Sequence, residues 1–69
     1  MFEKYDTVFA VTVDTSSKGT FVELASGEHG WIRCHLPCGV RVMATVLHVK
    51  DDGFLILALD SVQQALIAA

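Results

Sequence analysis

Six side chains of this 69-residue chain are of types that could hold an unpaired nucleic-acid strand. Three are aromatic and three are basic, and in chain order they are Lys18, Phe21, Trp31, Arg33, Lys50 and Phe54. Aromatic rings stack on unpaired bases at roughly 1–3 kcal/mol per base, and cations follow the phosphates. These six residues are therefore the candidate nucleic-acid contacts, provided that the fold brings them to one face.

Short β-rich runs separated by turn residues would have to position these side chains. The runs are rich in β-branched and aromatic residues and predict strands over Thr7–Asp14, Thr20–Ala25, His29 to about Cys34, Val40 to about Val49, and Phe54–Leu59. Because side chains alternate along a strand, Phe21 faces away from the side that holds Val22 and Leu24. The same alternation places Trp31 and Arg33 together on one face.

The arrangement of these runs predicts an all-β fold, a five-stranded antiparallel Greek-key barrel of the OB class. The Asp52-Gly53 pair between two apolar runs predicts a tight hairpin turn. The residues expected to point inward are Val22, Leu24, Ile32, Val42, Val46, Leu55 and Leu57. After the barrel, Ser61 and Gln64 match a capping box, which predicts a short C-terminal helix over about 61–68.

Length and composition indicate one small folded domain over residues 1–69, with its barrel over about 7–59. Hydrophobic residues make up 52% of the chain and charged residues 19%, a composition that argues against a disordered chain. The net charge of −3 argues against a general polyphosphate binder but leaves room for a local basic stripe. The first residues lack the apolar run of a signal peptide and the longest apolar stretch, 54–59, is too short to span a bilayer, so a cytoplasmic location is the default expectation.

The glycine and valine framework of the chain resembles the S1-type RNA-binding domain, a family named for a ribosomal small-subunit protein. Residues 19–24 read Gly-Thr-Phe-Val-Glu-Leu, where such domains show Gly-Ala-Phe-Val-Asp-Leu. Residues 30–33 read Gly-Trp-Ile-Arg in place of Gly-Leu-Val-His, and residues 39–46 keep the Gly-x-x-Val-x-x-x-Val spacing of the fourth strand. The resemblance covers most of the chain and implies an OB barrel that binds RNA or single-stranded nucleic acid.

The departures from the family pattern fall on its binding face. The loop at 16–18 is longer by one residue and has no aromatic residue before Gly19. Arg33 stands where the family has histidine, Lys50 where it has aspartate, and Phe54 where it has arginine. The segment between the third and fourth strands shrinks to about five residues. The resemblance is therefore stronger for the fold than for the ligand.

A second hypothesis is a protein-interaction module that keeps the barrel without the RNA site. Strand alternation turns Met43, Phe54 and Ile56 outward, and an apolar surface of this kind marks an interface. A homodimer is the simplest way to cover it, and a fold-back of the C-terminal helix is the intramolecular alternative.

Metal binding and catalysis are both disfavoured by the sequence. Cysteine and histidine residues cluster at His29, Cys34, His35 and Cys38, but no second ligand pair follows at the spacing of a zinc finger or ribbon. Asp51 and Asp52 are explained by turn chemistry, and no activated-nucleophile or phosphate-binding motif is present. We therefore expect no metal, no cofactor and no enzymatic activity.

Overall fold

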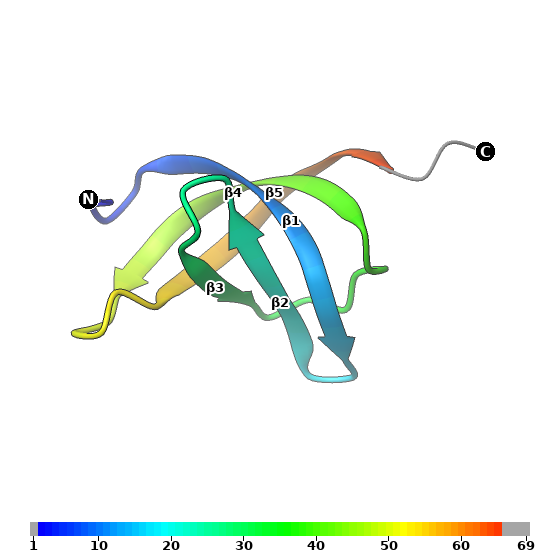
Figure 1. The fold of residues 1–69 in the computed structure, drawn as a ribbon, viewed down its shortest axis with the longest axis horizontal. Helices are drawn as coiled ribbons and strands as arrows, with labels where there is room; N and C mark the ends of the chain where they lie inside the picture. Colours follow the sequence, from blue (N-terminus) through cyan, green and yellow to red (C-terminus); the bar gives the residue numbers. More distant parts are fainter. Residues whose placement is uncertain (1, 66–69) are drawn as a thin grey trace.

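The computed structural model describes residues 2–65, which form a closed five-stranded barrel (Figure 1). The strands are β1 (Thr7–Ser16), β2 (Gly19–Leu24), β3 (His29–Ile32), β4 (Val40–Val49) and β5 (Leu55–Ala65). Their order around the barrel is β1-β2-β3-β5-β4, and β4 pairs with β1 to close the ring. The OB-type barrel predicted from the sequence is thus confirmed. Within residues 2–65 there is no helix of the length and apolarity that crossing a membrane requires.

One strand pair in the barrel is parallel, which corrects the prediction of a fully antiparallel sheet. β3 runs parallel to β5, with Gly30 beside Leu55 and Ile32 beside Leu57. The reason is topological: a closed ring with an odd number of strands cannot alternate direction at every step, so one neighbouring pair must be parallel. This register also sets Trp31 of β3 beside Ile56 of β5.

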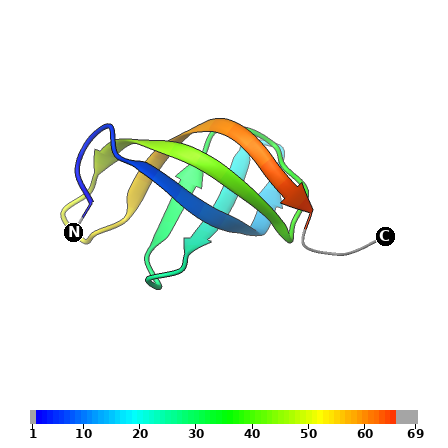
Figure 2. The ribbon, with the colours of Figure 1, turned by 90° about the horizontal axis from the view of Figure 1, so that it is seen from above.

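The second half of β5 corrects the prediction of a C-terminal helix. Residues 61–65 continue the strand and pair with β4, with Val62 beside Val42 and Ser61 beside Met43. The helix predicted over 61–68 is therefore wrong for 61–65, and 66–68 lie outside the described residues. Pairing along β4 satisfies backbone donors and acceptors that a short helix would leave open on that strand. Figure 2 shows β5 arching alongside β4 to the end of the described chain.

The barrel interior is filled by aliphatic side chains that alternate inward along the strands. All seven residues predicted to point inward are buried: Val22, Leu24, Ile32, Val42, Val46, Leu55 and Leu57. Leu36, from the segment between β3 and β4, joins the same core. Because the interior is packed with side chains, ligand contacts must be sought on the outer surface.

Two buried threonines fasten the β3–β4 segment across the end of the barrel. The hydroxyl of Thr20 donates to the carbonyl of Cys34 at 2.7 Å and accepts from the amide of Leu36 at 3.0 Å. The hydroxyl of Thr12 donates to the carbonyl of Pro37 at 2.6 Å and accepts from the first amide of β4 at 3.0 Å. These bonds satisfy backbone groups of a segment that has no strand partner.

Candidate nucleic-acid interface

Three aromatic rings meet on the outside of the barrel, and we call them the aromatic cluster: Phe21, Trp31 and Phe54. Phe21 on β2 is the cross-strand partner of Trp31 on β3, and their ring centroids lie 4.7 Å apart at an interplanar angle of 65°. Phe21 also meets Phe54 at 6.2 Å and 68°. Edge-to-face pairs at these distances stabilise one another and hold the rings in place. The Phe21 side chain is 43% exposed, so the cluster is open to solvent.

Gly19 lets the indole of Trp31 lie flat against the start of β2. A β-carbon at this position would overlap the Trp31 ring and would come within 2.6 Å of the carbonyl of Ile32. Only glycine leaves that space free. Lys18 directly precedes Gly19 in the β1–β2 turn, so a basic residue lies at the Trp31 end of the cluster.

Lys50 lies at the opposite end of the aromatic cluster, over Phe54. Its ammonium nitrogen is 5.9 Å from the centroid of the Phe54 ring, a cation–π distance. The hairpin is closed by a hydrogen bond from the amide of Lys50 to the carbonyl of Phe54 at 2.9 Å. In the same turn, a carboxylate oxygen of Asp52 accepts from the amide of Phe54 at 3.0 Å. The positive charge of Lys50 therefore has acidic neighbours in its own turn.

Arg33 lies just beyond the end of β3, two residues after Trp31. It is exposed and lines a hollow of about 610 Å³ together with the apolar side chains of Leu47, Ile56 and Ala58. Among residues 2–65 the cation–π contacts are made by Lys4, Arg41 and Lys50, and neither Arg33 nor Lys18 makes one with the cluster. Of the six predicted contacts, four thus meet directly, and Arg33 and Lys18 flank them.

His29 is a residue beside this face that the sequence reasoning considered only as a metal ligand. It is exposed on β3 two residues before Trp31, and its imidazole nitrogen is 4.0 Å from a carboxylate oxygen of Glu23. The signal that could have identified it is strand alternation, which places residues two apart on the same face. His29 and Glu23 are therefore further polar groups within reach of a strand bound on the cluster.

No metal centre is formed by the described part of the chain. Within residues 2–65, no three histidine, cysteine or acidic side chains come together closely enough to hold an ion. His35 Nδ1 instead donates to the carbonyl of Ser16 at 2.9 Å and so ties the β3–β4 segment to the end of β1. Cys34 and Cys38 are free thiols on the surface.

Several solved structures share this barrel. GSP13 from Bacillus subtilis superposes with a TM-score of 0.78 at 22% identity, over 86% of this chain and 56% of GSP13. The chain has an S1-like OB fold. A multidomain protein with nucleic acid binding domains from Streptococcus pneumoniae gives 0.74 at 23% identity, over 84% of this chain and 23% of that protein. The alpha subunit of aIF2 from Pyrococcus abyssi superposes with a TM-score of 0.75 at 23% identity, over 86% of this chain and 29% of that subunit.

The S1-like barrel accounts for only a part of these larger proteins. The chain spans about a quarter of the length of the pneumococcal protein and just over half of GSP13. No protein-family model matches the sequence, and no curated protein matches it. At these identities the likeness is one of fold, and what the surface binds must be argued from its own side chains.

The apolar residues predicted to form a homodimer surface lie well apart along the β4–β5 pair of the S1-like barrel. Met43 lies beside Ser61 of β5, whereas Ile56 of the same strand lies beside His48. Five residues of strand separate the two positions, on the order of 15 Å. Met43 instead pairs with Phe9 of β1, on another part of the outer surface.

Proposed function

We propose that this chain binds single-stranded nucleic acid, RNA in the first instance, on the aromatic cluster, and that it carries out no catalytic step. The observation that carries the proposal is the contact of Phe21 with both Trp31 and Phe54 on the outer face of the barrel. OB-type barrels use the face of strands two and three to bind oligonucleotides.

One structural neighbour supports the class of ligand. The Streptococcus pneumoniae protein is described as having nucleic acid binding domains, and its barrel matches this chain with a TM-score of 0.74. That match concerns the fold, so the case for this chain rests on its own rings and cations.

The proposed mode of binding is stacking, with phosphate contacts at both ends of the cluster. Each exposed ring accepts one base at roughly 1–3 kcal/mol, with little preference because every base has a π-face. Lys50 would contact phosphate near Phe54, and Lys18 and Arg33 would do so beyond Trp31. With three cations involved, the logarithm of the binding constant should fall with the logarithm of salt concentration with a slope of about −2.

The test is a titration of the chain with a short single-stranded RNA at low salt, read by the fluorescence of its one tryptophan, Trp31. We expect quenching on binding, and we expect Trp31→Ala to weaken binding to a labelled oligonucleotide by roughly tenfold or more, because one stacked base is lost. Duplex RNA of the same sequence should compete poorly because its bases are already paired.

Tyr5→Ala is the matched control for this titration. Tyr5 is 69% exposed and has its own cation, Lys4, at 5.3 Å from the ring, but it does not belong to the cluster. Its removal should leave the affinity unchanged. Unchanged Trp31 fluorescence at low salt, or an equal loss of affinity in Tyr5→Ala, would contradict the proposal.

A further inference from the structure

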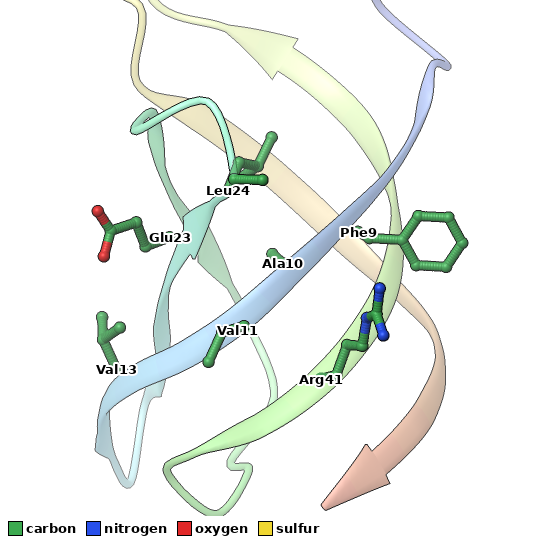
Figure 3. A pocket seen from close by; sticks show the side chains of 8 residues that line it. Phe9, Ala10, Val11, Val13, Glu23, Leu24 and Arg41 are labelled. Carbon is green, nitrogen blue, oxygen red and sulfur yellow. The ribbon is translucent and has the colours of Figure 1, made fainter. Parts of the chain in front are cut away.

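The outward side of β1 carries apolar side chains that the barrel leaves uncovered. Phe9 is 51% exposed and Val13 is 48% exposed, and Val11 lies between them on the same face. These residues line a hollow of about 560 Å³ that crosses the strand (Figure 3). Contiguous apolar surface of this kind marks an interaction site.

Opposite charges border this apolar strip on its two sides. Val11 is paired with Arg41 on β4 and with Glu23 on β2, so one row of the sheet reads Arg41, Val11, Glu23 at spacings of about 5 Å. Figure 3 shows Arg41 and Glu23 on opposite sides of β1. The guanidinium of Arg41 lies over the Phe9 ring at 5.8 Å, and the Glu23 side chain is exposed. We call these five residues the β1 face: Phe9, Val11, Val13, Glu23 and Arg41.

We propose that a second copy of this chain covers the β1 face. A two-fold axis that lies in the interface and runs nearly along β1 packs the apolar strip against itself. It also exchanges the two sides of the strip, so that Arg41 of each copy meets Glu23 of the other. An axis in the same plane but perpendicular to β1 would instead place Arg41 on the side of Arg41 of the other copy, and Glu23 on the side of Glu23. The aligned packing that results is the common way for two sheets to meet, and the interface is isologous.

The size of the molecule is compatible with such a dimer. A specific interface needs about 1,000 Å² in total, or about 500 Å² from each copy. The described surface of one copy is 4514 Å², so the interface would take roughly a ninth of it. A chain of 69 residues has a small core, and burying Phe9 and Val13 between copies would add to it.

The dimer does not depend on nucleic-acid binding and can be measured without it. None of the rings of the aromatic cluster belongs to the β1 face, and Glu23 is the residue of that face that lies nearest to Phe21 along β2. Failure of the dimer and failure of RNA binding are therefore separate results.

Charge reversal tests the proposed symmetry by sedimentation velocity. The chain itself should sediment as a concentration-dependent dimer. Glu23→Arg and Arg41→Glu should each raise the dimer dissociation constant at least tenfold, because each sets like charges against one another twice per dimer. A 1:1 mixture of the two variants should recover a dimer. In that heterodimer the new arginine faces the new glutamate, and the retained Arg41 faces the retained Glu23.

Lys4→Glu and Glu3→Arg serve as matched controls, since both positions are exposed and lie outside the β1 face. Neither should change the dissociation constant, alone or mixed. Amide spectra of each variant verify the fold. Three results would overturn the proposal: a monomeric chain at about 1 mM, single reversals without effect, or a mixture that stays monomeric. A monomer whose Phe9 and Arg41 amides shift on adding RNA would overturn it too and would assign the face to nucleic acid.

Discussion

Phe21 is the residue on which the aromatic cluster depends, because its ring contacts both of the others. It meets Trp31 at 4.7 Å and Phe54 at 6.2 Å, and it is open to solvent. Gly19 leaves the space that the Trp31 indole occupies, since a larger residue at this position would displace the ring. The site is therefore a set of rings held by mutual contact, with charge added at its edges.

The charge at the Phe54 edge can be tuned through Asp52. Its carboxylate accepts a hydrogen bond from the amide of Phe54, and an asparagine retains that acceptor while losing the negative charge beside Lys50. We expect Asp52→Asn to tighten binding of single-stranded RNA about twofold to fivefold at low salt, with the gain lost at high salt as the charges are screened. Fluorescence anisotropy at two salt concentrations measures both.

Asp6→Asn is the control for that change. The Asp6 carboxylate accepts from the amide of Glu3 at 2.8 Å in the same kind of local turn, but it lies outside the cluster. Equal gains in the two variants would show that only net charge matters and would count against a contact at Lys50.

At the scale of elements, the β3–β4 segment is the part whose position depends on single hydroxyl groups. Thr20→Val keeps the shape of the side chain but leaves the amide of Leu36 and the carbonyl of Cys34 without their partner. We expect the free energy of unfolding to fall by about 1–3 kcal/mol, measured by urea denaturation.

Thr7→Val is the matched control for this substitution. Thr7 is exposed at the start of β1, and its replacement should stay within about 0.5 kcal/mol of the parent. If Thr20→Val were equally neutral, the hydroxyl would not be what fastens the segment.

Which elements could be predicted depended on whether their causes were local. Period-two alternation revealed the five strands, the seven buried core residues and the outward direction of Phe21 and Trp31. Each of these features depends only on a few residues that are adjacent in sequence. The end of β5 was missed because Ser61 and Gln64 satisfy a local capping pattern, whereas the partner that makes them a strand is β4, about twenty residues away in sequence. The parallel β3–β5 pair was missed for the same reason.

For the candidate site, too, local features could be predicted from the sequence and long-range contacts could not. The types of all six residues were visible in the sequence, but the meeting of Phe54 with Phe21 depends on the register between β3 and β5. The cation–π contact between Arg41 on β4 and Phe9 on β1 likewise required these two strands to pair, and no sequence motif pointed to it.

At the scale of the whole molecule, the barrel presents two outer surfaces that adjoin on β2, where Phe21 and Glu23 point to the same side. One holds the aromatic cluster with three of the five basic residues around it, and the other is the β1 face with its balanced charges. With a net charge of −3, long-range attraction to nucleic acid is weak, so the proposed affinity must come from stacking at the cluster.

The most direct test of this account is an amide-shift titration of the chain with short single-stranded RNA at low salt. We predict shifts concentrated at Phe21, Trp31, Lys50 and Phe54, with smaller ones at Lys18 and Arg33, all diminishing as salt is raised. Phe9, Val11, Val13 and Arg41 of the β1 face should remain unshifted. The absence of any shift at low salt, or shifts centred away from the aromatic cluster, would contradict the claim that these rings bind nucleic acid.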